Sequence, residues 1–374
     1  MPPEKHKKFI FAGGGTGGHI YPAIAIASGL KRKYPDSDIL FIGTGKQLEK
    51  DIVEEAGFPL KIIHAKGFER KLSIDTLRSL HQLILGAADS IKILKEEKPD
   101  LVIGTGGYTA GPVVFFASLM GIPCAIHEQN VIPGVTNKIL SRFAKKIFIS
   151  FPESANYFPK NKVILAGNPV RPEITKGTRR EALEKFGLSP NMPTVLSFGG
   201  SQGAMSLNNA IYYVIKTLIK SKEFQLIHVT GKNNYNKIMQ SLMDDKIDLG
   251  SASHIVIKPY INDMENAYAA ADLIISRAGA LTIAELSACG KPAILIPLPS
   301  AANRHQDFNA ALMEKNGAAI VIYEKDLTGE KLYKSICNII FDKECLLKMS
   351  ASSKKLARSN ALDTILQEIE KLLK

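Results

Sequence analysis

A run of glycines that joins a strand to a helix constrains this chain more than any other feature. Residues 13–18 read Gly-Gly-Gly-Thr-Gly-Gly, after an apolar strand signal at 8–12 and before a helical pattern at 20–30. Such turns leave backbone N–H groups at the positive end of a helix dipole, where anions bind. Five glycines in six positions cost too much backbone entropy for a turn that binds nothing. His19 ends the run and can move a proton near neutral pH, so the segment predicts phosphate binding beside acid–base chemistry.

The same glycines fit the G-x-G-x-x-G fingerprint of dinucleotide-binding domains, which needs an acidic residue at the end of the second strand. The expected second strand, 38–42, runs into Gly43-Thr-Gly45, and the acidic residues Asp36 and Asp38 precede that end. A nicotinamide enzyme is therefore disfavoured. The pair Asp36 and Asp38 resembles the metal pair of some sugar transferases, but its place beside Pro35 favours a surface turn. No His, Cys and carboxylate set has metal-ligand spacing, so we predict no protein-bound metal.

Length and composition predict a two-domain globular protein. The chain has 374 residues, too many for one ordinary core, and 45% of them are apolar. Four scattered cysteines without a Cys-x-x-Cys motif are typical of reduced thiols in a cytosolic protein. No stretch reaches the roughly 18 apolar residues of a membrane-spanning helix. The net charge of +12, with no nucleic-acid module and no Trp, favours a membrane surface or a phosphorylated ligand over nucleic acid.

Short strand signals alternate with helical patterns along the chain, which is typical of parallel sheets covered by helices. Further strands are expected at 101–103, 124–126, 146–149, 194–198, 226–229, 273–275 and 293–296. A second strand–glycine–helix start at Gly199–Ala204 echoes the first. We therefore predict two doubly wound α/β domains, 1–171 and 172–354, with the seam in the Pro/Gly-rich stretch 167–172. The last helix, about 355–374, has one apolar face, and we expect it to return to the first domain.

The strongest candidate for a nucleotide site is the segment 276–285, which follows a strand and opens a helix. The N–H groups of such a helix start suit a diphosphate. Glu285 lies one turn in from Thr282, where a carboxylate repels phosphate but can accept both hydroxyls of a ribose. The alternative is a capping box, with Thr282 at the cap and Glu285 three residues on. Together with the other glycine loops, the segment favours nucleotide binding.

Three further loops follow strands of the predicted sheets. Gly104–Pro112 is a second glycine-rich strand–helix connection. His127-Glu-Gln-Asn130 places four polar side chains at the end of a strand, and a sugar or acceptor contact competes there with a plain solvated loop. In the loop 303–307, the Gln306 amide suits sugar hydroxyls.

Seven ordered motifs in residues 9–315 resemble the MurG family, the peptidoglycan transferases that add N-acetylglucosamine to lipid I and so make lipid II. The motifs are Ala12 to His19, Gly106-Gly-Tyr to Gly111-Pro112, His127 to Asn130, Gly167 to Arg171, Gly199 to Ala204, Arg277 to Glu285, and Gln306 with Asn309-Ala310. The tail after about residue 320 carries no motif of that family.

The resemblance implies a GT-B fold, with two Rossmann-like domains and a cleft between them. It implies UDP-N-acetylglucosamine as donor, undecaprenyl-diphosphate-linked N-acetylmuramyl-pentapeptide (lipid I) as acceptor, and no cofactor. The donor-binding residues that it implies are Thr16, Gly17, Gly18, Asn130, Arg171, Ser201, Ile261, Ala280, Leu281, Thr282, Glu285 and Gln306. The residues that it implies for the acceptor diphosphate are Gly14, Gly15, Thr16, Gly106, Gly107 and Tyr108.

Several of these residues have specific roles by similarity. Glu285 would hold the ribose, the backbone of Ile261 would read uracil, and Gln306 with Asn130 would hold the sugar. The reaction would be an inverting single displacement at the anomeric carbon. The acceptor hydroxyl then needs a base, for which His19 is the first candidate and Glu128 the second.

A lipid-linked acceptor implies contact with the cytoplasmic face of the inner membrane, and proteins of cell-wall synthesis as partners. The candidate membrane patch comprises Lys66, Arg70, Lys71, Leu72, Ile74 and Leu85. Leu77, Leu80, Ile84, Ala88 and Ile91 recur at helical spacing, and we expect that face to be core.

Rival functions remain open from the residues alone. A UDP-N-acetylglucosamine 2-epimerase would share the fold and the donor but need no lipid. A diacylglycerol glycosyltransferase fits the outline, although the motif 127–130 favours lipid I. A non-catalytic nucleotide-sugar sensor is disfavoured, because His19, Glu128 and both glycine loops are intact and a binder needs only the donor half.

Overall fold

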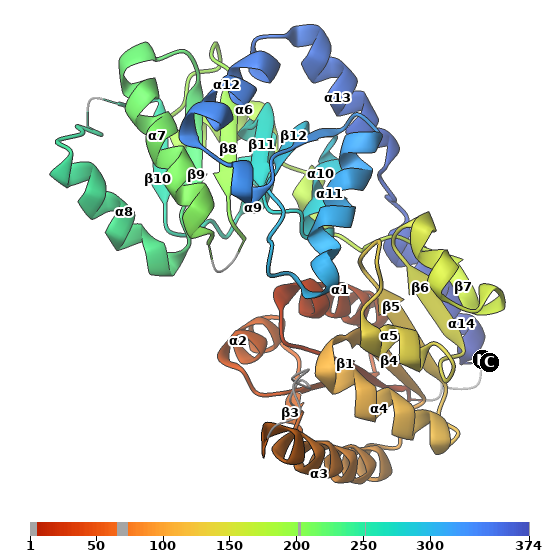
Figure 1. The fold of residues 1–374 in the computed structure, drawn as a ribbon. Helices are drawn as coiled ribbons and strands as arrows, with labels where there is room; N and C mark the ends of the chain where they lie inside the picture. The colour runs from red at the N-terminus through yellow and green to blue at the C-terminus, as the bar shows by residue number, and fades with distance from the viewer. Residues whose placement is uncertain (1–5, 66–73, 201–202, 251, 374) are drawn as a thin grey trace. The chain divides into compact units, whose positions relative to one another are not determined.

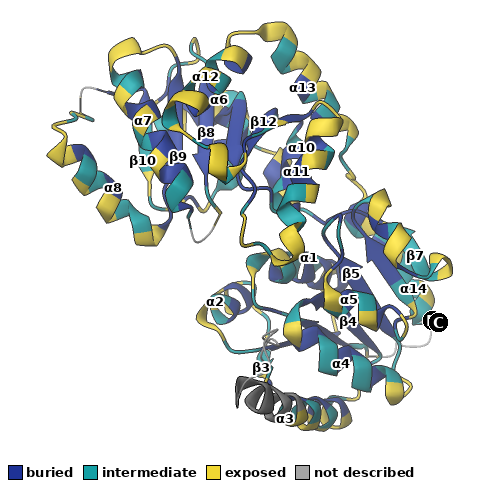
Figure 2. Cartoon of the chain, in the orientation of Figure 1, coloured by how far each residue is buried: buried dark blue, intermediate teal, exposed yellow. Residues whose placement is uncertain are grey.

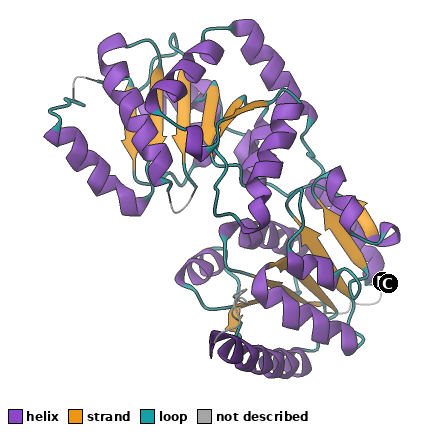
Figure 3. Cartoon of the chain, in the orientation of Figure 1, coloured by secondary structure: helices purple, strands orange, loops and turns teal. Residues whose placement is uncertain are grey.

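A computed structural model of the chain describes residues 6–65, 74–200, 203–250 and 252–373, with the backbone alone for 74–83. The chain forms two compact units, one of Met1–Val170 with Ser359–Lys374 and one of Arg171–Arg358. Each unit is a parallel β-sheet flanked by helices (Figures 1 and 3). The predicted α/β class with two doubly wound sheets is confirmed. The assignment of acceptor and donor to separate units stays a prediction.

The first unit contains a seven-stranded sheet in the order β3-β2-β1-β4-β5-β6-β7. Its strands are β1 (Lys8–Gly13), β2 (Asp38–Gly43), β3 (Leu60–Ile62), β4 (Leu101–Gly106), β5 (Cys124–Glu128), β6 (Lys146–Ile149) and β7 (Val163–Leu165). Its α-helices are α1 (Gly17–Lys33), α2 (Gln47–Glu55), α3 (Ile74–Glu97), α4 (Gly107–Leu119), α5 (Val135–Leu140) and α14 (Ala361–Leu372), with short 3-10 turns at Pro152–Tyr157 and Lys160–Lys162.

Alternate residues of β1 pack into a separate core on each face of this sheet, and its inner strands are largely buried (Figure 2). Phe9 and Phe11 pack on the face covered by α1 and α14. Ile10 and Ala12 pack on the face covered by α3 and α4. The C-terminal helix α14 buries Ile365 against the first of these faces and contacts α1.

The second unit contains a six-stranded sheet in the order β10-β9-β8-β11-β12-β13. Its strands are β8 (Thr194–Phe198), β9 (Gln225–Val229), β10 (Ile255–Lys258), β11 (Leu273–Ser276), β12 (Ala293–Leu295) and β13 (Ala319–Val321). Its α-helices are α6 (Arg179–Phe186), α7 (Met205–Ser221), α8 (Lys232–Asp244), α9 (Met264–Ala270), α10 (Ala280–Cys289), α11 (His305–Lys315), α12 (Gly329–Ile340) and α13 (Lys343–Lys355), with 3-10 turns at Pro172–Thr175, Ala302–Arg304 and Glu324–Asp326.

The described part of helix α3 does not bury all of the face that its large apolar residues predict. Ile84 is 61% exposed and Ala88 is exposed too, whereas Leu85, predicted for the membrane patch, is half-buried. The helix packs through Gly86, where an added Cβ would lie 2.1 Å from the carbonyl oxygen of His64, and through the buried side chains of Ile93 and Leu94. The small residue at the contact lets the two backbones approach, which a count of large apolar side chains does not reveal. No described helix is long and apolar enough to cross a membrane.

Candidate functional site

Each sheet has a point where the strand order reverses, and the glycine loops follow the strands at these points. In the first unit the reversal lies between β1 and β4, and in the second between β8 and β11. Ligands of doubly wound sheets bind at the carboxyl ends of the strands there.

The loops that follow β1 and β4 pack directly on each other. An added Cβ on Gly107, whose φ is +77°, would lie 2.5 Å from the carbonyl oxygen of Gly14. An added Cβ on Gly106 would lie 3.1 Å from Nε2 of His19. Only glycine allows this approach, which brings the N-termini of α1 and α4 together. Gly14 and His19 of the first glycine loop therefore lie beside Gly106 and Gly107 of the second, as one candidate site. Tyr108, the next residue, is 59% exposed.

The backbone orients the His19 ring. Its Nδ1 lies 3.0 Å from the carbonyl oxygen of Gly14. A carbonyl can only accept a hydrogen bond, so Nδ1 carries the proton and Nε2 of the neutral ring has a lone pair. His19 is half-buried at the start of α1, just after the exposed Thr16. This geometry suits a group that takes a proton through Nε2.

Glu128, the second candidate base, has both carboxylate oxygens engaged. Oε1 accepts from the backbone N–H and Nδ2 of Asn130, at 3.0 and 3.2 Å. Oε2 accepts from Nδ2 of Asn137 at 2.8 Å and from the N–H of Gly134 at 3.1 Å. The side chain is 1% exposed, so the carboxylate shapes the loop after β5 and His19 is the better placed base.

The neighbours of Glu128 form a buried network, so the solvated-loop interpretation of the motif 127–130 is wrong. Nε2 of His127 donates to the carbonyl oxygen of Gly167 at 3.0 Å, and Nδ1 accepts from Nε2 of Gln129 at 3.1 Å. Burial lowers the pKa of His127 to about 4, so the ring is neutral. Only Asn130 of the four residues is partly exposed.

Sequence reasoning missed Glu49, a buried carboxylate on α2. Its Oε1 accepts from the backbone N–H of Gly15 at 2.6 Å. That N–H is therefore already bonded, which opposes the predicted use of Gly15 as a diphosphate donor. An acidic residue in a helix at a sequence distance of 34 residues gives no local signal of this contact.

In the second unit, Glu285 lies in α10 and does not cap it. Gly279 is the N-cap residue, and no side chain bonds the cap. The capping-box interpretation is therefore wrong, because Thr282 lies inside the helix. Glu285 is 8% exposed, and its Oε2 accepts a hydrogen bond from the Tyr268 hydroxyl at 3.1 Å.

Burial dominates the electrostatics of Glu285. It raises the pKa of this carboxyl to about 7, against the lowering effects of the Arg171 charge and of the hydrogen bond from Tyr268. Nη2 of Arg171, itself largely exposed, lies 3.9 Å from Oε1. Leu281 and Thr282 lie in the first turn of α10, next to the buried Ala280, where N–H groups lack helical partners.

Of the other predicted donor residues, Gln306, Ile261 and Ser201 belong to the same unit, whereas Thr16, Gly17, Gly18 and Asn130 belong to the first unit. Gln306 is half-buried on α11, and its Oε1 accepts the N–H of Leu298 at 2.9 Å, so its Nε2 is the group left for a sugar. Asp307 accepts a hydrogen bond from Nε of Arg304 at 2.7 Å. Ile261 is buried between β10 and α9. Ser201 lies outside the described residues.

Arg277 is a second residue whose role the sequence did not reveal. Its Nη1 donates to the carbonyl oxygens of Ile296 and Pro297, at 3.2 and 3.3 Å, and its Nη2 donates to Oγ of Ser206 at 3.0 Å. Glu324 completes a salt bridge with it. One buried guanidinium thus fixes the loops after β11 and β12 against the start of α7.

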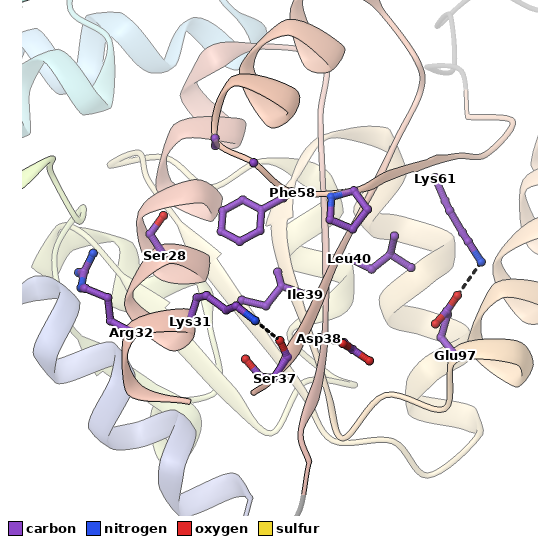
Figure 4. A pocket seen from close by; sticks show the side chains of 13 residues that line it. Ser28, Lys31, Arg32, Ser37, Asp38, Ile39, Leu40, Phe58, Lys61 and Glu97 are labelled. Carbon is purple, nitrogen blue, oxygen red and sulfur yellow. Dashed lines mark hydrogen bonds and ion pairs between the residues drawn. The ribbon is translucent and has the colours of Figure 1, made fainter. Parts of the chain in front are cut away.

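A pocket of about 710 Å³ opens at the opposite end of β2, where the strand begins (Figure 4). Two of the cations that line it, Lys31 and Lys61, are already engaged. Lys31 donates to the carbonyl oxygen of Ser37 at 2.6 Å, and Lys61 donates to Glu97 at 2.6 Å. We assign no ligand to this pocket, because it lies away from the carboxyl edge. The described residues hold no group of three or more His, Cys, Asp or Glu suited to a metal ion, and the absence of a protein-bound metal stays a prediction.

The sequence matches known proteins along most of its length. Residues 9–149 match the glycosyltransferase family 28 N-terminal domain, and residues 194–365 match its C-terminal domain. The crystal structure of Acinetobacter baumannii MurG superposes with a TM-score of 0.76 at 30% identity, covering 98% of this chain and 99% of that one. The chain belongs to the MurG family of glycosyltransferases. This MurG family member thus has the expected GT-B fold.

A curated relative extends the match to the full MurG chain. The UDP-N-acetylglucosamine--N-acetylmuramyl-(pentapeptide) pyrophosphoryl-undecaprenol N-acetylglucosamine transferase of Thermoanaerobacter sp. (strain X514) is 47% identical over 98% of this chain and 100% of its own length. The UDP-GlcNAc 2-epimerase from Neisseria meningitidis bound to UDP-GlcNAc superposes with a TM-score of 0.68 over 97% of this chain and all of that one, but at 15% identity. The epimerase is therefore similar in fold alone.

Proposed function

We propose that this enzyme transfers N-acetylglucosamine from UDP-N-acetylglucosamine to the acceptor lipid I, giving lipid II. The full-length match to a curated N-acetylglucosamine transferase carries the proposal, and the arrangement of both loop clusters supports it. The epimerase alternative has fold likeness only, and no side-chain arrangement described above favours it.

The donor binds at α10 of the second unit. The carboxylate of Glu285 accepts the ribose hydroxyls, while Arg171 and the first turn of α10 at Leu281 and Thr282 balance the diphosphate charge. Gln306 offers its Nε2 to the sugar. The backbone of Ile261 reads uracil.

The acceptor diphosphate binds where the loops after β1 and β4 meet in the first unit. The acceptor hydroxyl attacks the anomeric carbon as the bond to UDP breaks, which inverts the configuration. The hydroxyl proton passes to Nε2 of His19, and the leaving charge on UDP is stabilised by the helix start and by Arg171. No protein-bound metal enters this scheme.

The enzyme works peripherally at the cytoplasmic face of the inner membrane. Basic residues there add about 1 kcal/mol each on anionic lipid. Lys66, Arg70, Lys71 and Leu72 of the proposed patch lie outside the described residues, and only the backbone of Ile74 is described. On the described part of α3, the exposed Ile84 replaces the half-buried Leu85 as the apolar contact.

The deciding experiment measures UDP release from UDP-N-acetylglucosamine with and without a lipid I analogue. Release that needs the analogue and yields a disaccharide supports the transferase. Conversion of the donor without the analogue would make the epimerase the better assignment. UDP binding without release in either case would indicate a sensor.

A further inference from the structure

Glu49 on α2 is bound by two loops at once. Its Oε1 accepts from the N–H of Gly15 at 2.6 Å and from Oγ1 of Thr44 at 2.9 Å. Its Oε2 accepts from the N–H groups of Thr44 and Gly45, at 2.7 and 3.0 Å. The side chain is only 2% exposed. A buried carboxylate with this number of donors is held in one orientation.

The same contact leads to His19 through a single peptide group. The N–H of Gly15 and the C=O of Gly14 belong to one peptide plane. The N–H donates to Glu49 at 2.6 Å, and the C=O accepts from Nδ1 of His19 at 3.0 Å. The carboxylate and the imidazole are therefore linked through one amide.

Neighbouring groups lie close to this peptide on both sides. An added Cβ on Gly14 would lie 2.4 Å from Oε1 of Glu49. The carbonyl oxygen of Gly14 lies 2.5 Å from where a Cβ of Gly107 would be. A flip would also break both hydrogen bonds of the peptide. The orientation of His19 thus depends on the group that fixes the peptide from its other side.

We propose that Glu49 is a positioning residue that holds His19 in its proton-accepting form, an inference that rests on the proposed role of His19 as the base. The carboxylate polarises the Gly14–Gly15 peptide, which strengthens the carbonyl as an acceptor. The proton then stays on Nδ1, and Nε2 keeps its lone pair for the acceptor hydroxyl. When Nε2 takes the proton, the polarised carbonyl stabilises the imidazolium.

The test replaces the charge with a neutral amide of the same shape, in Glu49→Gln. Asp100→Asn is the matched control, because Asp100 accepts the N–H of Lys8 at 2.8 Å at the opposite end of β1. ¹⁵N NMR of the free enzyme, labelled at histidine and assigned with His19→Asn, reports which ring nitrogen of His19 is protonated. We expect Nδ1–H in the wild type and in Asp100→Asn, and a shift toward Nε2–H in Glu49→Gln.

Turnover with the lipid I analogue is measured on the same proteins. We expect kcat to fall about 10–100-fold in Glu49→Gln, with KM for UDP-N-acetylglucosamine unchanged. An unchanged His19 tautomer in Glu49→Gln overturns the proposal. A changed tautomer with full kcat also overturns it, and the turnover of His19→Asn then shows whether the base assignment itself has failed.

The wild-type enzyme provides a second measurement that does not depend on the folding of any variant. The amide proton of Gly15 should resonate far downfield and exchange slowly, as expected for a buried N–H bonded to a carboxylate. A random-coil shift with fast exchange at Gly15 would overturn the proposal.

Discussion

The hydroxyl of Tyr268 donates a hydrogen bond across 3.1 Å to Oε2 of Glu285, and both side chains are buried. Tyr268 lies on α9 and Glu285 on α10, so tertiary packing holds the carboxylate that would bind the ribose. One hydroxyl leaves most of the carboxylate's acceptor capacity unused.

Removing the carboxylate should weaken nucleotide binding. We expect Glu285→Ala to lose about 1.5–3 kcal/mol of UDP binding free energy, because two ribose hydroxyls lose a charged acceptor. Isothermal titration calorimetry measures the loss. Glu314→Ala, on the neighbouring α11, is the control and should bind UDP normally. Unchanged UDP affinity in Glu285→Ala would refute the ribose contact.

Burial of Glu285 should make stability depend on pH in a definite direction. The pKa is about 7 in the folded chain and near 4.5 when the carboxyl is exposed. Because the folded chain holds the carboxyl proton more tightly, the contribution of Glu285 to the free energy of unfolding is complete below about pH 4.5. It is lost as the pH rises through 7, and the loss is at most about 3 kcal/mol. Glu285→Gln should therefore gain in Tm relative to the wild type between pH 5 and 7. Parallel Tm curves for the two proteins would contradict this expectation.

Loss of the candidate base should affect turnover and not donor affinity. We expect His19→Ala to reduce kcat with the lipid I analogue by about 10²–10⁴. UDP affinity should stay unchanged, because the ribose and diphosphate contacts proposed for Glu285, Leu281 and Thr282 all lie in the second unit. A variant with near-normal turnover would exclude His19 as the base.

The C-terminal helix should be needed for the stability of the first unit. Ile365 of α14 is fully buried in the core formed with α1. We expect Ile365→Ala to cost about 2–5 kcal/mol, measured by urea unfolding. Leu347→Ala, at a side chain that is 71% exposed, should change stability by less than about 0.5 kcal/mol. Equal effects of the two substitutions would show that α14 does not stabilise the core.

The strands that the sequence predicted are the inner strands of each sheet, and those it missed are the edges. β3, β7, β10 and β13 have three or four residues each and lie at the ends of the two strand orders. Inner parallel strands are covered on both faces and are apolar throughout, which gives a strong local signal. Edge strands are short and partly exposed, so apolar and polar residues follow no clear pattern along them and the local signal is weak.

The candidate site likewise has residues that local sequence patterns predict and contacts that they do not. Glycine runs and polar residues after apolar strands are local patterns, and from them His19, Glu128 and Glu285 could be selected. Whether a carboxylate is available depends on donors far away in the chain. Asn137 donates a hydrogen bond to the carboxylate of Glu128, and the carboxylate of Glu49 accepts the N–H of Gly15.

The sequence by itself determined the class of fold, the places of the glycine loops after the strands, and the family, because strand periodicity and turn chemistry are properties of neighbouring residues. The tertiary structure decided that α14 packs on α1, that α3 packs through Gly86, and that Glu49 is joined to His19 by one peptide. These depend on burial and on hydrogen bonds between distant segments. Such contacts exist only once the sheets have assembled.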